Sequence, residues 1–171
     1  IKPPVIKSEG IEIRPSSQWY DAERNFIYLV KDNGIARYNL GNNQTTIIPR
    51  LSLLGNLSGN AGVCASALDA DGHIWFMIPQ YGIRIINPET LHCEDSIQFG
   101  TRGLIRGDYT HITGAEKPFM LLRSQNGIVV YDYSKRQSFL FNRDNGLSSP
   151  DNQSLLYSNG YMLIAEGGSF E

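Results

Sequence analysis

The sequence predicts an all-β fold made of repeated four-stranded antiparallel sheets. Its apolar runs are four or five residues long and rich in β-branched and aromatic residues, which favours strands over helices. A glycine follows each run after a short turn, and a second turn precedes each run. The runs are residues 26–30, 74–78, 119–122 and 161–165, and the glycines are Gly34, Gly82, Gly127 and Gly168.

The glycines recur at spacings of 48, 45 and 41 residues. A repeat of about 45 residues is typical of a four-stranded propeller blade, so we expect a β-propeller segment. The chain's 171 residues make about 3.5–4 such blades, which we expect to be part of a larger ring. The alternative is a closed four-bladed ring, in which residues 1–14 complete the sheet begun by residues 153–171.

A single propeller segment is expected over residues 1–171, with turns dividing it into strands. Asp-Gly at 71–72 and Asn-Gly at 159–160 are strong hairpin signals. The expected blades are 15–50, 60–100, 108–142 and an incomplete 152–171, with 1–14 as a strand of a preceding or closing blade. The expected strands are 17–20, 26–30, 34–40 and 45–49; 63–68, 73–78, 82–87 and 93–99; 109–113, 118–123, 127–133 and 137–141; and 153–157, 161–165 and a stub from 168.

The middle strands do not alternate between apolar and polar residues, as residues 74–78 and 83–86 show. This pattern indicates strands that are covered on both faces, as in blades packed face to face. Trp19 and Tyr20 lie in the expected first strand of their repeat, and we expect their side chains in the hydrophobic core.

Composition excludes several functional classes. Lys plus Arg is 15 and Asp plus Glu is 17, a net charge of −2, which argues against nucleic-acid binding. The apolar runs are far shorter than the ~18 residues of a membrane helix, so we expect no membrane contact by this segment.

The two cysteines, Cys64 and Cys93, are expected to be small buried residues with free thiols. They fall on the first and fourth strands of one blade, which are about 14 Å apart at ~4.8 Å per strand. A disulfide needs Cα atoms within ~7 Å, so these two residues cannot form one.

Motifs for catalysis, metal binding and cofactor binding are absent, so we expect no catalytic residue, metal or cofactor and no enzymatic activity. His73, His92 and His111 lack ligand spacing. Residues 69–72, Asp-Ala-Asp-Gly, begin like a calcium loop but lack its later acidic ligands. We interpret them as a turn in which an aspartate caps its own backbone. The glycine-rich residues 100–107 precede no helix and are not interpreted as a phosphate site.

Two stretches of the second repeat resemble the two-component regulator propeller repeat: 69–76, Asp-Ala-Asp-Gly-His-Ile-Trp-Phe, and 81–90, Tyr-Gly-Ile-Arg-Ile-Ile-Asn-Pro-Glu-Thr. Residues 144–148 resemble its Asn-Gly-Leu-Ser linker, and residues 159–168 resemble its core. The resemblance implies the N-terminal periplasmic sensor region of a hybrid histidine kinase, with the kinase elsewhere in the protein. It also implies an oligosaccharide ligand.

Propeller ligands usually bind where the second-to-third-strand turns meet the connections between blades. Here these segments carry amides, carboxylates, arginines and tyrosines, which suit hydroxyl-rich or anionic sugars. The candidate ligand-binding residues are Asp32, Asn33, Gln80, Tyr81, Arg102, Arg106, Tyr109, Gln125 and Asn126. The same connections also carry Asp108, Asp144 and Asn145.

The leading hypothesis is a non-catalytic sensor segment whose partners are an oligosaccharide, the rest of the propeller and sensor chain, and a second copy in a homodimer. A protein-interaction scaffold that uses blade faces and edges is the first alternative. A propeller glycoside hydrolase or lyase is the second, and two carboxylates converging at the ring centre would be its mark.

Overall fold

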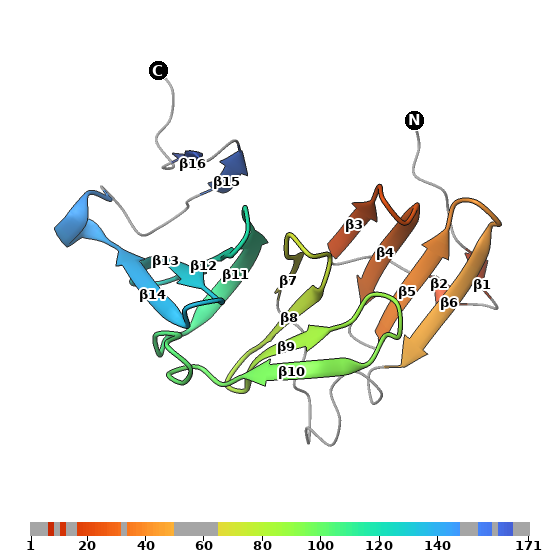
Figure 1. Ribbon diagram of the computed structural model, residues 1–171, viewed down its shortest axis with the longest axis horizontal. Coiled ribbons are helices and arrows are strands. Elements are labelled where there is room, and N and C mark those ends of the chain that lie inside the picture. Colours follow the sequence, from red (N-terminus) through yellow and green to blue (C-terminus); the bar gives the residue numbers. More distant parts are fainter. Residues whose placement is uncertain are drawn as a thin grey trace. The chain divides into compact units, whose positions relative to one another are not determined.

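The computed structural model describes residues 7–8, 11–12, 17–31, 34–49, 65–147, 154–158 and 161–165 (Figure 1). These residues form antiparallel strands joined by turns, with one 3-10 helix at Arg143–Asn145. Three of the sheets have four strands each, so the predicted all-β, propeller-type architecture is confirmed. The chain divides into two compact units, Ile1–Leu57 and Ser58–Glu171, which are described separately.

The N-terminal unit contains one four-stranded sheet and a separate two-stranded one. The short strands β1 (Lys7–Ser8) and β2 (Ile11–Glu12) pair with each other, and their assignment to a neighbouring blade stays a prediction. The larger sheet has the order β3 (Ser17–Asp21), β4 (Phe26–Lys31), β5 (Gly34–Asn39) and β6 (Gln44–Pro49).

The expectation that Tyr20 belongs to the core is wrong. Successive residues of a strand face opposite sides of the sheet. Trp19 packs against Tyr28, with ring centroids 6.5 Å apart, whereas Tyr20 points the other way and is 58% exposed. Its hydroxyl donates a hydrogen bond to Asn25 Oδ1 at 3.4 Å.

The C-terminal unit holds two consecutive four-stranded sheets and a strand pair. The first sheet contains β7 (Ala65–Leu68), β8 (Ile74–Ile78), β9 (Gly82–Ile86) and β10 (Cys93–Ile97). The second contains β11 (Tyr109–Gly114), β12 (Phe119–Ser124), β13 (Gly127–Asp132) and β14 (Gln137–Phe141). The pair consists of β15 (Ser154–Ser158) and β16 (Tyr161–Ala165).

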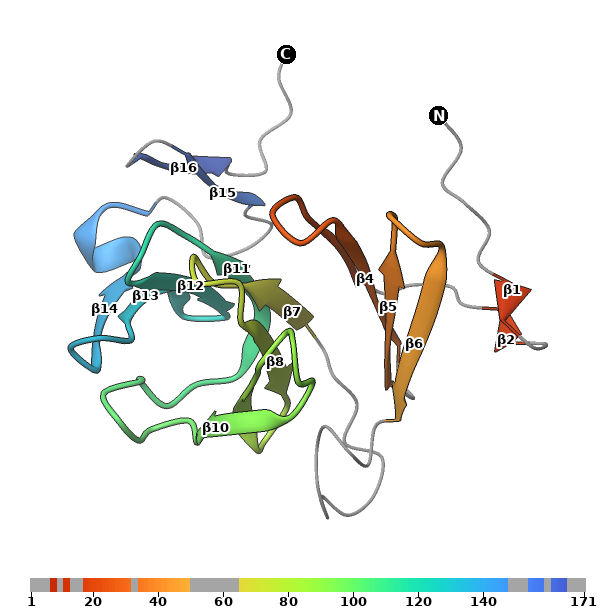
Figure 2. The same cartoon turned by 45° about the vertical axis from the view of Figure 1, so that its right-hand side comes forward.

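The strand boundaries in the three larger sheets agree with the expected ones to within two residues. Residues 63 and 64 of the expected strand 63–68, residue 153 of the expected strand 153–157 and the stub from residue 168 lie outside the described residues. β7 and β11, the first strands of consecutive sheets, contact each other and lie side by side in both views (Figures 1 and 2). This is the arrangement expected where successive blades converge on a propeller axis.

A shared hydrophobic core joins the two sheets of the C-terminal unit. Every residue of β8 is buried, which confirms that this strand is covered on both faces. Trp75 and Met77 point toward the second sheet, where Met120, Leu122 and Tyr131 meet them. Both sheets therefore contribute alternate residues of their strands to one cluster.

The repeating glycine has a structural reason in these two sheets. Gly82 and Gly127 open β9 and β13 with φ values of 104° and 134°, which side-chain-bearing residues rarely adopt. A Cβ atom at Gly82 would lie 2.0 Å from the carbonyl oxygen of Ile97, and one at Gly127 would lie 2.1 Å from that of Phe141. The sequence repeat thus marks a place where the backbone of the fourth strand leaves no room for a side chain on the third.

Cys93 is a free cysteine, as expected, but it is exposed rather than buried. It begins β10, the outer strand of its sheet, where four of five residues are exposed. Cys64 lies outside the described residues. Among those that the structure describes, no helix is long and apolar enough to cross a membrane.

Candidate functional site

A groove of about 270 Å³ lies between the β7–β10 and β11–β14 sheets. One side of it is acidic and belongs to the first sheet and its turns, and the other side carries arginines. The acidic side consists of Asp69, Asp71, Glu94 and Asp95, with His73 among them. Arg102 and Arg136 form the basic side, and the remaining lining residues are Trp75, Ile85, Ile97, Tyr131 and Tyr133.

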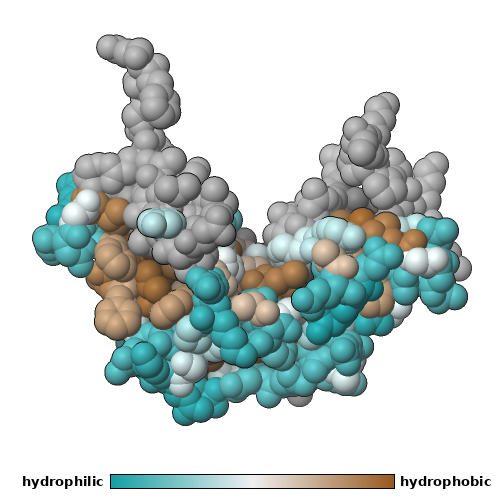
Figure 3. All heavy atoms as spheres, turned by 45° about the horizontal axis from the view of Figure 1, so that its top comes forward, coloured by the Kyte–Doolittle hydropathy of each residue, from teal (hydrophilic) through white to brown (hydrophobic). Residues whose placement is uncertain are grey.

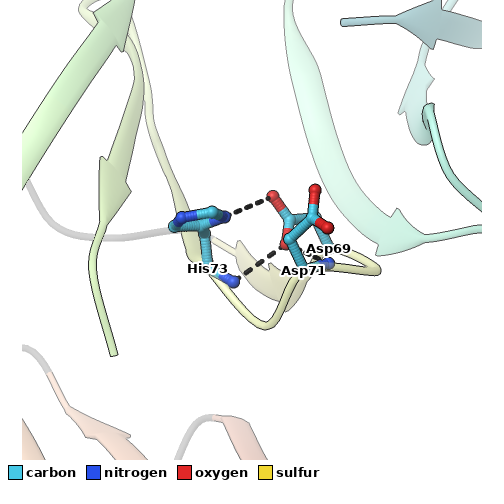
Figure 4. A group of neighbouring side chains, drawn as sticks. All are labelled: Asp69, Asp71 and His73. Carbon is cyan, nitrogen blue, oxygen red and sulfur yellow. Dashed lines mark hydrogen bonds and ion pairs between the residues drawn. The ribbon is translucent and has the colours of Figure 1, made fainter. Parts of the chain in front are cut away.

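The turn between β7 and β8 is organised by the buried Asp69 (Figure 4). Its Oδ1 accepts hydrogen bonds from the backbone N–H groups of Asp71 at 2.9 Å and His73 at 2.8 Å. Its Oδ2 accepts one from Trp75 Nε1 at 2.8 Å and lies 3.2 Å from His73 Nδ1. The predicted aspartate-capped turn is therefore confirmed, and it also anchors the indole of the core tryptophan.

Asp69, Asp71 and His73 bring three possible metal-ligand atoms within 4.8 Å of one another. Hydrogen-bond donors already surround both oxygens of Asp69. One oxygen of Asp71 accepts a hydrogen bond from Lys117 Nζ at 2.8 Å. The trio therefore acts as a hydrogen-bonded turn that is tied through Lys117 to the next sheet.

Glu94 and Asp95 extend the acidic side along β10. Arg102 Nη1 bonds both oxygens of Asp95, at 2.7 and 2.6 Å. Glu94 accepts a hydrogen bond from Asn87 Nδ2 at 2.8 Å, and its other oxygen lies 3.7 Å from His73 Nε2. Both partners of the Asp95–Arg102 pair are partly exposed, so the pair contributes only about 0–1 kcal/mol to stability.

Three aromatic side chains form the inner part of the groove. The Trp75 ring lies 6.4 Å from the Tyr131 ring and 5.5 Å from the Tyr133 ring, measured between centroids. The hydroxyl of Tyr131 donates to the backbone oxygen of Arg102 at 3.0 Å. The buried hydroxyl of Tyr133 has no hydrogen-bond partner among the described residues. Burial, with the nearby carboxylates of Asp69 and Asp71, raises the pKa of Tyr133 to about 12, so this hydroxyl stays protonated.

Replacing Tyr133 with phenylalanine is expected to leave the protein's thermal stability unchanged or to raise it slightly. A buried hydroxyl without a partner costs about 1–3 kcal/mol of desolvation, which its removal relieves. Tyr131→Phe is the matched control, because it removes a hydroxyl that is bonded to Arg102. We expect the free energy of unfolding of that control to fall by about 1 kcal/mol. Equal decreases in the melting temperature of the two variants would contradict the conclusion that the Tyr133 hydroxyl lacks a partner.

Of the predicted ligand-binding residues that the structure describes, Arg102 is the one that lines the groove, beside the 69–73 turn. Gln80 and Tyr81 occupy the β8–β9 turn, at the opposite end of the same sheet. Gln125 and Asn126 occupy the corresponding β12–β13 turn and are exposed.

The other predicted residues take different positions. Arg106 is exposed and does not line the groove. Tyr109 is buried, and its hydroxyl donates to the backbone oxygen of Ile105 at 2.5 Å. Burial raises the pKa of Tyr109 to about 12. Asp32 and Asn33 lie outside the described residues. Whether any of these side chains contacts a ligand stays a prediction.

Sequence reasoning did not place Glu94, Tyr133 or Arg136 in the candidate site. Tyr133 and Arg136 lie in the turn between the third and fourth strands of their repeat. The expected ligand-binding face consists instead of the turns between second and third strands and the connections between blades. Their sequence neighbourhoods contain ordinary turn residues, such as Ser134 and Lys135. Tyr133 and Arg136 reach the site because the Arg102 region packs against their turn, and no local sequence pattern indicates this contact.

No known family profile matches the chain, and no curated protein matches it significantly. Solved structures do match it. The extracellular domain of the hybrid two-component system BT3049 from B. thetaiotaomicron aligns with 90% of this chain at a TM-score of 0.64 and 17% identity. The extracellular domain of BT4673 from the same organism aligns with 81% of the chain at a TM-score of 0.51 and 23% identity. The WD40 repeats of RRP9 align with 75% of the chain at a TM-score of 0.55 and 15% identity.

These likenesses establish the class of fold: the chain is a partial β-propeller. The solved neighbours include extracellular domains of two-component sensors, the group whose repeat the sequence resembles. The chain spans only 20% of the BT3049 domain, 17% of the BT4673 domain and 38% of the RRP9 chain.

Proposed function

We propose that this chain is a ligand-sensing propeller segment of a two-component signal-transduction sensor, located in the periplasm. We further propose that its ligand is an oligosaccharide and that the segment has no catalytic activity of its own. The observation that carries the proposal is the alignment of 90% of the chain with the extracellular domain of BT3049. The motif at residues 69–76 and 81–90 supports the same class independently of the three-dimensional comparison.

The groove between consecutive sheets is chemically suited to a sugar. Carbohydrate hydroxyls both donate and accept hydrogen bonds, and the groove presents carboxylate acceptors on one side and guanidinium donors on the other. A ligand held between two blades would favour one packing of those blades over another. Such a change in packing would bias the pairing of sensor chains and so the output of the kinase.

The proposal is tested with the intact protein that contains this chain. We expect saturable binding of at least one oligosaccharide in a glycan array, verified by calorimetry, and a shift in self-association measured by sedimentation velocity. Reducing-end assays on the bound glycan should detect no cleavage, and cleavage would instead support the hydrolase alternative. The proposal fails if no glycan binds and self-association is the same with every glycan tested.

A protein-interaction scaffold is the second candidate function. Phe139 and Phe141, on the outer strand β14, are 55% and 36% exposed. Figure 3 shows hydrophobic surface among the polar side chains of the face that it presents. The double variant Phe139→Ser, Phe141→Ser would abolish association with a protein partner if the scaffold function holds, and would leave glycan binding unchanged if the sensor function holds.

A further inference from the structure

The groove between the β7–β10 and β11–β14 sheets offers hydrogen-bonding groups that the described residues leave unused. We infer that it is the saccharide-binding site of the chain and that it selects a neutral, hydroxyl-rich sugar through Arg136 and Tyr133. This inference rests on the proposed function, whose ligand class and place of binding it narrows. It differs from the site expected at the β8–β9 and β12–β13 turns.

Several charges that line the groove already have partners. Asp95 is paired with Arg102, and Asp71 with Lys117. Asp69 accepts hydrogen bonds from two backbone N–H groups and an indole N–H. The four carboxylates of the lining outnumber its two arginines, so the groove as a whole does not attract an anionic ligand strongly.

Arg136 is a lining charge without such a partner. It lies in the turn between β13 and β14 with φ 55°, lines the groove, and has no ion pair or side-chain hydrogen bond among the described residues. Its guanidinium therefore offers its N–H donors to an incoming group. The neighbouring Lys135, by contrast, points to Asp132 at 3.8 Å and does not line the groove.

The hydroxyl of Tyr133 is a second donor without a partner. Glu94 faces these donors from β10 as an acceptor, since only one of its oxygens has a hydrogen bond shorter than 3.5 Å. A ligand group that meets both sides must accept and donate at once, and a sugar hydroxyl does so. The volume of about 270 Å³ is just below the usual range of ~300–1,000 Å³ for small-molecule sites, enough for about one or two sugar rings.

The experiment measures binding to the intact protein, by calorimetry, of a panel of neutral disaccharides and trisaccharides and their uronic-acid counterparts. Arg136→Gln should weaken binding of the neutral sugar about tenfold or more, because it removes a charge-assisted hydrogen bond. Tyr133→Phe should weaken binding about three- to tenfold without lowering thermal stability.

Two controls separate this site from its surroundings and from the other face. Lys135→Gln removes a neighbouring positive charge and should leave affinity unchanged. Gln80→Ala alters the β8–β9 turn at the opposite end of the sheet and should also leave it unchanged. Wild-type affinity in Arg136→Gln and Tyr133→Phe, or a loss of binding in Gln80→Ala, would overturn the inference while the proposed function stands.

The remaining outcomes are equally decisive. If uronic-acid sugars bind more tightly than neutral ones, the selection of a neutral sugar is wrong. If free amino acids bind in an Arg136-dependent manner and sugars do not, the groove is a binding site for a different class of ligand. If the wild-type protein binds no saccharide in the panel or the array, the proposed function itself fails.

Discussion

Replacing Asp69 with alanine is expected to lower the free energy of unfolding by about 3 kcal/mol or more. The substitution strands the backbone N–H groups of Asp71 and His73 and the indole N–H of Trp75, each of which donates to this carboxylate. A buried donor left without a partner costs about 1–3 kcal/mol. Trp75 is 1% exposed, so water cannot replace the lost acceptor without disturbing the core.

Chemical denaturation of the purified protein measures this effect. Asp71→Asn is the matched control, because Asp71 lies in the same turn but forms a partly exposed ion pair with Lys117. Such surface pairs contribute about 0–1 kcal/mol, so the control should unfold close to the wild type. Similar denaturation midpoints for Asp69→Ala and Asp71→Asn would show that Asp69 does not organise the turn.

Replacing Gly82 with alanine is expected to cost about 3 kcal/mol of stability, at the upper end of the range for local backbone strain. The position has φ 104°, and the added Cβ would lie 2.0 Å from the carbonyl oxygen of Ile97. The obstructing atom belongs to the backbone of β10, so relief requires β9 and β10 to separate.

Gly107→Ala is the control for this second prediction. A Cβ atom there would meet the Tyr109 ring at 3.4 Å, an ordinary van der Waals distance. We expect the control to change the unfolding midpoint little and Gly82→Ala to lower it clearly. If both variants unfold at the same denaturant concentration, close approach of the strands is not the reason for the recurring glycine.

The strands were predictable because their signals are local. Short β-branched runs, Asp-Gly and Asn-Gly turns and a glycine at each third strand act over a few neighbouring residues, and they recur with the length of a blade. Burial of individual residues was less predictable. Tyr20 and Cys93 are exposed because the side of the sheet and the position of the strand within it decide their environment.

The site was predictable only in part. The capped turn at Asp69 depends on contacts within six residues, so the Asp-Ala-Asp-Gly pattern sufficed to predict it. Arg102 was a candidate because of its place between two blades. Its neighbours in the structure depend on a contact between distant residues. The hydroxyl of Tyr131 donates a hydrogen bond to the backbone oxygen of Arg102, 29 residues away in the sequence.

The sequence by itself determined the repeated four-stranded sheets, their turns and the resemblance to sensor propellers. The tertiary structure decided where the functional groups meet. The connection between β10 and β11 folds against the β13–β14 turn, where Ser138 Oγ donates to the Gly103 oxygen at 2.6 Å. That packing brings Arg136 and Tyr133 to face the acidic side of the preceding sheet. Side chains that far apart along the chain become neighbours only when the two sheets bury their common core, so local sequence patterns carry no record of the groove.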